Sequence, residues 1–263
     1  MRTENIYCDY CKKMTTAEGV KKETLHGFLV ELGYSLGGWG NRRNFVNPHT
    51  VEICTDCFNS VKKKADELVS NLIAVYNERI DKLDWMSAET KVKAKEKLNA
   101  ITRKIGYPDK WKDYAGLEIT RNSFFKNLMN ATAWDYNYAI SQIGKPVDRT
   151  KWGMTPPTVN AYYNPSMNEI VFPAGILQPP FFNAQADDAV NYGGIGAVIG
   201  HELTHGFDDE GRNFDAKGNL NAWWTSEDSA KFVTRAQIII DQFDGFTVLD
   251  TLHVNGHLTL GEN

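Results

Sequence analysis

The five residues His201-Glu202-Leu203-Thr204-His205 constrain this chain more than any other part of its sequence. Residues four positions apart lie on the same face of an α-helix, so a helix here lets both imidazoles bind one metal ion. Glu202 is rotated about 100° from His201 around such a helix, and its carboxylate can reach a water molecule without binding the metal. The spacing therefore predicts a metal-dependent hydrolytic site, with His201 and His205 as ligands and Glu202 as general base.

The motif defines only three of its five positions and can therefore arise by chance. The residues around it help to decide whether it did. Residues 193–200 are small and apolar, which favours a helix packed closely against its neighbours. An unpaired histidine and glutamate in such a place would be costly, so a metal ion is the natural partner. The setting favours metal binding over coincidence.

A catalytic zinc ion usually takes three protein ligands and keeps one position open, so a third ligand is needed. The carboxylates at 208–210 lie too close to the motif to fold back easily as ligands. One of them is better placed to hydrogen-bond an imidazole. Spacing alone does not choose among the remaining candidates, which are Glu227, Asp241, His253, His257 and Glu262.

Periodicity elsewhere predicts a mostly helical chain with little β-structure. Apolar residues recur every three to four positions in segments that we expect to be helical, at about 62–83, 125–143 and 192–207. Ser87 can cap a helix that runs to about Ala100. Two β-prone runs, 159–163 and 169–172, flank a turn-rich segment and predict a hairpin.

A last long helix is expected near the end of the chain. Thr225 or Ser226 can cap it, and Gly245 can end it. Its apolar residues are expected to face inward, and they are Phe232, Ile239, Ile240 and Phe243.

The four cysteines form two Cys-x-x-Cys pairs, Cys8/Cys11 and Cys54/Cys57. Two such pairs can supply the four thiolates of a structural zinc site, and a loop that bears a hairpin can absorb the long gap between them. Residues 1–60 have too little apolar surface to fold without a cross-link, so we expect a small zinc-ribbon-like module. Disulfides or free redox thiols are the alternatives, although no thioredoxin-like context is visible.

Charge and hydropathy exclude other classes of protein. A net charge of -4 argues against an overall basic nucleic-acid binder. Arg42 and Arg43 can contact nucleic acid locally, but a solvated loop explains them better. The N-terminus is too polar for a signal peptide, and no apolar run approaches the roughly 20 residues of a transmembrane helix. Compartment and oligomeric state are not indicated.

Residues from about 62 to 263 resemble the neprilysin and endothelin-converting enzyme family of zinc metallopeptidases. The stretches that carry the resemblance are VNAYYNP at 159–165, EIVFPAGILQPPFF at 169–182, NYGGIGAVIGHELTHGFDDEGRNFD at 191–215, NAWW at 221–224 and HVNGHLTLGEN at 253–263. The resemblance implies an α+β, mostly helical fold over residues 61–263. Its core would be a thermolysin-like zinc peptidase of the gluzincin type, with a short β-hairpin and an edge strand.

The resemblance also implies roles for residues of the metal site. Glu262, in a Gly-Glu-Asn sequence, would be the third zinc ligand beside His201 and His205. Asp208 would be a carboxylate that hydrogen-bonds a ligand from behind. The implied activity is that of a zinc-dependent metalloendopeptidase that hydrolyses oligopeptides.

Substrate contacts follow from the same resemblance. Asn160 and Ala161 match the edge strand that holds an extended peptide by strand addition. Val198 falls where the family lines its pocket for a bulky apolar side chain.

The family's enclosing helical lobe and its motifs after Glu262 are absent from this sequence, so we expect an incomplete fragment with low activity. The alternative is a non-catalytic zinc-ribbon adaptor fused to a peptidase remnant that binds zinc or peptide without turnover. Family members work mostly outside the cytoplasm.

Overall fold

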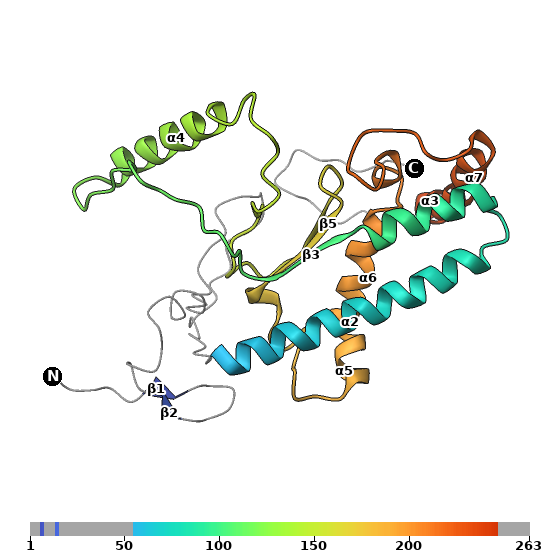
Figure 1. Cartoon of the computed structure of the whole chain (residues 1–263), viewed down its shortest axis with the longest axis horizontal. Coiled ribbons are helices and arrows are strands. Elements are labelled where there is room, and N and C mark those ends of the chain that lie inside the picture. Colours follow the sequence, from blue (N-terminus) through green and yellow to red (C-terminus); the bar gives the residue numbers. More distant parts are fainter. Residues whose placement is uncertain (1–5, 8–13, 16–54, 247–263) are drawn as a thin grey trace.

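The computed structural model describes residues 6–7, 14–15 and 55–246, and helices outweigh strands among them (Figure 1). The helices are α2 (Thr55–Lys82), α3 (Ala88–Asn99), α4 (Phe124–Ile140), α5 (Asp188–Gly193), α6 (Ile195–His205) and α7 (Ser226–Asp244). The strands are β1 (Ile6–Tyr7), β2 (Met14–Thr15), β3 (Thr102–Gly106), β4 (Tyr162–Asn164) and β5 (Glu169–Pro173). Short 3-10 turns lie at Ala174–Ile176 and Gly211–Asn213.

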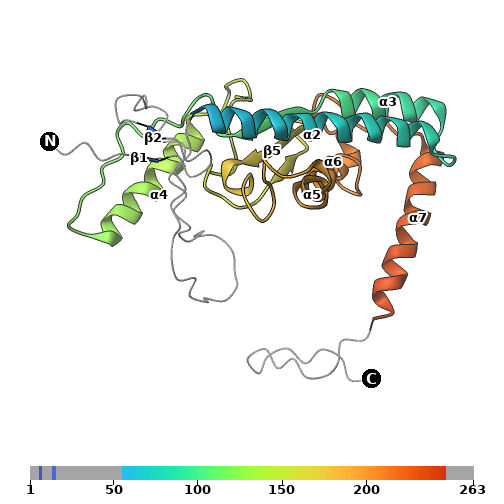
Figure 2. The ribbon, with the colours of Figure 1, turned by 90° about the horizontal axis from the view of Figure 1, so that it is seen from below.

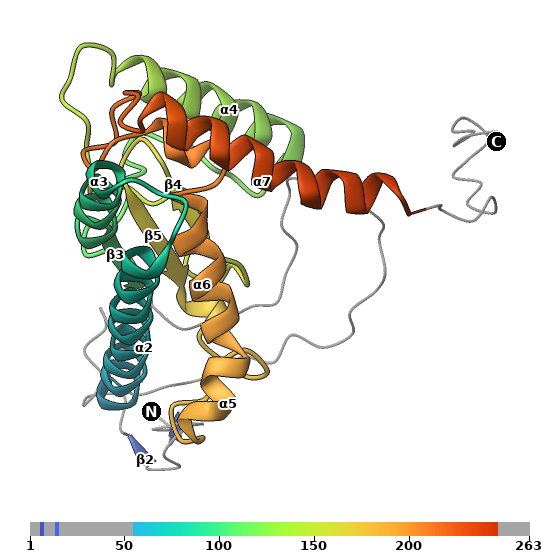
Figure 3. The ribbon, with the colours of Figure 1, turned by 90° about the vertical axis from the view of Figure 1, so that its right-hand side faces the viewer.

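Helix α2 organises the fold because it contacts α3, α6 and β3. Figure 2 shows α2 and α3 along one side of the molecule and β5, α5 and α6 on the other, with α4 and α7 at opposite ends. Viewed from the side in Figure 3, α6 runs beside α2. The hydrophobic core between these layers includes Leu68, Val69, Ile170, Phe172 and Ile199.

The three-stranded sheet has the order β3-β5-β4. Strands β4 and β5 pair antiparallel, with Tyr163 opposite Ile170, so the expected hairpin is confirmed. Strand β3 pairs in parallel with β5 and was not predicted from the sequence. Its first two residues, Thr102 and Arg103, are exposed, and its partner is distant in sequence, so no local pattern indicated it. The central strand β5 is buried along its whole length, which anchors β4 at the sheet edge.

The expected helix starts and stops are largely confirmed. The Ser87 and Thr225 side chains accept hydrogen bonds at the N-termini of α3 and α7, and Gly245 ends α7. The segment expected as one helix over 192–207 is divided at Gly194, where the Ile195 N–H donates to the Phe181 carbonyl. The first long helix begins at Thr55 rather than near 62, so α2 crosses the expected boundary between residues 60 and 61.

The apolar residues of α7 were expected to face inward, but most of them are exposed, and the apolar stripe of α4 is exposed as well. No residue of α4 is buried, and Phe125 is 71% exposed. On α7, Ile239, Ile240 and Phe243 are at least 50% exposed, whereas Phe232 is half-buried. The helical period was correct, but both helices extend away from the core, so their apolar faces stay open within the described residues. None of the helices placed in this structure has the length and apolarity to cross a membrane.

A buried carboxylate joins the start of α3 to the start of α7. Asp228 is 1% exposed and accepts hydrogen bonds from the Ser87 backbone N–H and hydroxyl. Burial alone would raise the pKa of Asp228, but hydrogen bonds from Ser87, Thr90 and Thr225 lower it to about 2. The ionised carboxylate therefore holds α7 onto the body of the fold.

Replacing Asp228 with asparagine is expected to lower the free energy of unfolding by about 1.5–3 kcal/mol near neutral pH, because charge-assisted hydrogen bonds are lost. The folded pKa is lowered from 3.8 to about 2, so this stabilisation is present above 3.8 and is lost as the pH falls toward 2. Urea unfolding across this pH range measures the effect. Glu227→Gln, at an adjacent exposed residue, is the control, and equal stability of both variants at pH 7 would refute the interpretation.

Candidate metal centre

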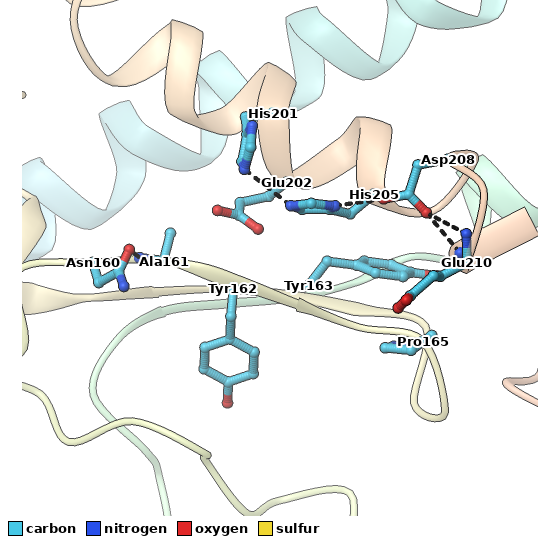
Figure 4. A pocket seen from close by; sticks show the side chains of 11 residues that line it. Asn160, Ala161, Tyr162, Tyr163, Pro165, His201, Glu202, His205, Asp208 and Glu210 are labelled. Carbon is cyan, nitrogen blue, oxygen red and sulfur yellow. Dashed lines mark hydrogen bonds and ion pairs between the residues drawn. The ribbon is translucent and has the colours of Figure 1, made fainter. Parts of the chain in front are cut away.

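Helix α6 carries the motif on a face distinct from its buried one. Ile195, Ile199 and Leu203 pack into the core with at most 1% exposure. His201 and His205, four residues apart, meet on another face (Figure 4). Their Nε2 atoms lie 2.9 Å apart, and their rings meet edge to face at 4.4 Å between centroids. The helix therefore brings two imidazole nitrogens to one point, as the spacing predicted.

A carboxylate holds the second imidazole from behind. The Asp208 Oδ2 atom lies 2.7 Å from His205 Nδ1, while Asp208 Oδ1 accepts hydrogen bonds from the backbone N–H groups of Glu210 and Gly211. A histidine that donates Nδ1–H to a carboxylate presents the lone pair of Nε2 to a metal. The expected position of Asp208 behind a histidine is therefore what the structure shows.

Glu202 lies beside the two histidines but is much less exposed. The residue is 5% exposed, and its carboxylate accepts a hydrogen bond from the Tyr163 backbone N–H. Burial raises the pKa of Glu202, although the two imidazoles and the hydrogen bond from Tyr163 oppose the shift. A carboxyl group with a raised pKa is a better proton acceptor than an ordinary surface glutamate.

The three motif side chains open into a cavity of about 370 Å³ between α6 and the hairpin (Figure 4). The lining residues come from the hairpin, from α6 and from the loop that follows α6: Asn160, Ala161, Tyr162, Tyr163, Pro165, His201, Glu202, His205, Asp208, Glu210 and Gly211. One wall is thus an edge strand and the other is the metal-binding face of the helix. This arrangement can admit an extended chain.

The residues expected to contact substrate occupy different surroundings. Asn160 and Ala161 line the cavity but directly precede β4 rather than lying within it. The Asn160 Oδ1 atom accepts a hydrogen bond from the Ala161 N–H. Val198 is half-buried against the hydrophobic core and does not line this cavity within the described residues.

Most of the other residues singled out from the sequence lie outside the part of the chain that the structure describes. Glu262, Cys8, Cys11 and Cys54 lie outside the described residues, as do Arg42 and Arg43. Cys57 belongs to the first turn of α2, but its side chain is not described. Within the described residues, no group of three His, Cys, Asp or Glu side chains is placed to hold a metal ion.

Two buried polar residues near the site were not singled out from the sequence. The Asn168 side chain accepts a hydrogen bond from the Tyr163 hydroxyl and donates to the carbonyls of Lys97 and Ala216. Asn168 has φ of +47°, in the left-handed region that asparagine tolerates, so its turn position was a usable signal. Lys97 is 1% exposed but lies among the other lysines of α3, and no sequence pattern distinguishes it.

The chain matches known families of zinc-binding peptidases over the residues that form this site. Two family models, both described as Peptidase family M13, match residues 53–108 and 160–263. An endothelin-converting enzyme homolog from Locusta migratoria is 43% identical over 209 residues, covering 77% of this chain and 29% of that protein. Neprilysin from Homo sapiens is 39% identical over 234 residues, covering 85% of this chain and 31% of that protein.

Solved structures give the same result. The zinc metalloprotease Zmp1 of Mycobacterium tuberculosis, in complex with an inhibitor, is 50% identical with a TM-score of 0.70 over 74% of this chain and 30% of that one. PepO from Lactobacillus rhamnosis is 36% identical with a TM-score of 0.68 over 72% of this chain and 30% of that one. The chain thus spans less than a third of the length of each of these relatives.

Proposed function

The chain belongs to peptidase family M13, and from this premise we propose that it is a zinc-dependent metalloendopeptidase, or the ligand-bearing part of one, that hydrolyses oligopeptides. One observation carries the proposal: two imidazole Nε2 atoms 2.9 Å apart stand beside a buried glutamate in a cavity walled by an edge strand. His201 and His205 are the only histidines among the residues that the structure describes.

The proposed ligands of the catalytic zinc are His201, His205 and Glu262. Zinc–nitrogen bonds are about 2.0–2.1 Å long, so two nitrogens on one ion must lie within about 4 Å of each other. The observed separation of the Nε2 atoms meets this requirement. The donor set of two imidazoles and one carboxylate also suits a catalytic zinc ion that keeps one position open. Glu262 lies outside the described residues, and its role rests on the Gly-Glu-Asn sequence.

In the proposed mechanism, Glu202 accepts a proton from the attacking water and returns it to the departing amine. A bound zinc ion would lower the pKa of water to near 7 and polarise the peptide carbonyl. Asp208 keeps the proton of His205 on Nδ1, so that the other ring nitrogen stays available. Burial of Glu202 keeps its carboxylate away from bulk water and raises its affinity for the proton.

The hairpin is the proposed substrate cradle. Strand β4 is at the edge of its sheet, so an extended peptide can add to it through backbone hydrogen bonds. Asn160 and Ala161 directly precede this strand, line the cavity and would contact the peptide there. We also propose that Val198 contributes to a preference for substrates with a bulky apolar side chain.

A second zinc ion is proposed in the module of residues 1–60, bound by Cys8, Cys11, Cys54 and Cys57. Strands β1 and β2 flank the first cysteine pair and form an antiparallel pair, with Tyr7 opposite Met14. Two short paired strands around a Cys-x-x-Cys sequence are compatible with a zinc-binding turn. Because α2 begins at Thr55, Cys57 would tie this module to the first turn of the peptidase portion, residues 61–263.

We expect two zinc ions per chain after mild chelation, with peptide hydrolysis dependent on only one of them. Cys54→Ser should leave one zinc ion and the hydrolysis of a quenched fluorescent peptide, whereas His201→Ala should leave one zinc ion and no hydrolysis. Elemental analysis and the peptide assay on the same samples measure both quantities. One zinc ion unchanged by Cys54→Ser would remove the cysteine site, and two zinc ions without turnover would favour the adaptor alternative.

A further inference from the structure

A buried ammonium group lies directly beneath the end of the motif helix. Lys97 is 1% exposed, and its Nζ donates three short hydrogen bonds to backbone carbonyls. The acceptors are the oxygens of Gly206 at 2.6 Å, Gly211 at 2.6 Å and Phe214 at 2.7 Å. The three N–H donors of the ammonium group are therefore all used, and each partner belongs to the loop that follows α6.

Aromatic rings complete the surroundings of this ammonium group. The rings of Tyr163, Phe207 and Trp223 have their centroids 5.6–5.8 Å from Lys97 Nζ. Burial lowers the pKa of Lys97 to about 8, although the attraction of the nearby carboxylates of Asp208 and Asp215 opposes the shift. The group remains largely protonated at neutral pH, because the three carbonyls and the ring faces substitute for water.

The positions of the three carbonyls connect Lys97 with the metal centre. Gly206 follows His205 and caps α6, so the ammonium group also meets the negative end of the helix dipole. Gly211 is held at both ends: its carbonyl accepts from Lys97, and its N–H donates to Asp208 at 2.7 Å. Asp208 in turn bonds His205. A continuous set of contacts therefore runs from Lys97 through Gly211 and Asp208 to His205 Nδ1.

We propose that Lys97 is a positioning residue of the metal centre, which holds the loop 206–214 so that Asp208 keeps His205 in its metal-binding tautomer and orientation. This inference rests on the proposed function for its consequence in catalysis. The contacts themselves belong to the zinc-free protein and can be tested there. Loss of the ammonium group would release the carbonyls of Gly206, Gly211 and Phe214, so the loop that carries Asp208 would be held only by its own internal hydrogen bonds.

The test is Lys97→Met, which keeps the length and apolar stem of the side chain and removes its charge and donors. Lys93→Met is the matched control, since it makes the same change on the exposed side of the same helix, where Lys93 pairs with Glu89. Two quantities are measured: the ¹⁵N and ¹H signals of the His205 imidazole in the zinc-free chain, and zinc affinity by competition with a chelator.

Lys97→Met is expected to reduce the population with a proton on His205 Nδ1 and to weaken zinc binding by about 10–100-fold, the usual cost of losing a group behind a metal ligand. Lys93→Met should change neither. In an Asp208→Asn background, Lys97→Met should add little further loss, because both residues act through the same contact. An unchanged imidazole signal and zinc affinity in a folded Lys97→Met chain would overturn the proposal.

Two further measurements cover the case in which Lys97→Met does not fold. Lys97→Arg keeps a charged donor and is expected to restore the His205 signal at least in part. In the unmodified chain, the Gly211 amide must be protected from hydrogen exchange as strongly as the amides in the middle of α6, and rapid exchange there would overturn the proposal. A wild-type chain that binds zinc and gives these signals but does not hydrolyse peptides would refute the proposed function and leave the role of Lys97 intact.

Discussion

Replacing Glu202 with glutamine is expected to lower kcat/KM for peptide hydrolysis by about 10²–10⁴-fold while leaving the zinc content unchanged. Glutamine has nearly the same shape but cannot accept the proton of the attacking water. Glu202 lies beside the two histidines without hydrogen-bonding to either, so their positions should not change. Because burial already raises the pKa of Glu202, a neutral amide should be accommodated without loss of stability.

The measurement is a steady-state assay with a quenched fluorescent peptide, combined with elemental analysis of the same preparation. Glu78→Gln, the same change on the exposed surface of α2, is the control and should leave both quantities unchanged. A Glu202→Gln chain that lost its zinc would mean that Glu202 has a structural role at the metal. A chain that kept both zinc and full turnover would exclude Glu202 as the general base.

Replacing Gly211 with alanine is expected to destabilise the fold by more than about 3 kcal/mol and to weaken zinc binding by at least about 10-fold. A Cβ atom on Gly211 would lie 1.7 Å from the carbonyl oxygen of His205 and 3.1 Å from the carbonyl carbon of Gly206. Both are backbone atoms, so the loop must move away. That movement breaks the hydrogen bonds of Gly211 with Asp208 and Lys97, and the support of the metal-binding histidine is lost with them.

Urea unfolding and chelator competition measure the two effects. Gly200→Ala is the matched control, because Gly200 lies in α6 next to His201 and a Cβ there would meet nothing within 4 Å. Alanine in this helix position is expected to raise stability by up to about 1 kcal/mol, since glycine loses more backbone entropy on folding. If Gly211→Ala retained the stability and zinc affinity of the unmodified chain, the loop would not be held as the contacts indicate.

The features that were predicted correctly depend on residues close together in the sequence. The meeting of His201 and His205 follows from the pitch of one helix, and the cap at Ser87 follows from hydrogen bonds within one turn. The β4–β5 hairpin joins neighbouring segments. Asp208 behind His205 is also a local relation, three residues along the chain. Such features need no knowledge of how distant segments pack.

The features that were missed depend on contacts between distant segments. Strand β3 exists because β5 lies beside it, and its own residues carry no clear strand pattern. The exposed apolar faces of α4 and α7 have the same period as buried faces, so the sequence could not indicate that they are exposed. A periodic stripe predicts that a helix has an apolar face but not where that face lies in the fold.

The placement of His201, Glu202 and His205 on one helix could be inferred from their spacing alone. The groups that support these side chains became visible only in the folded chain. Lys97 resembles the other lysines of α3 until the fold buries it against three carbonyls more than a hundred residues later in the chain. Helix periodicity is a short-range property, whereas the burial of a charge and the partners that compensate for it arise only when distant segments pack together.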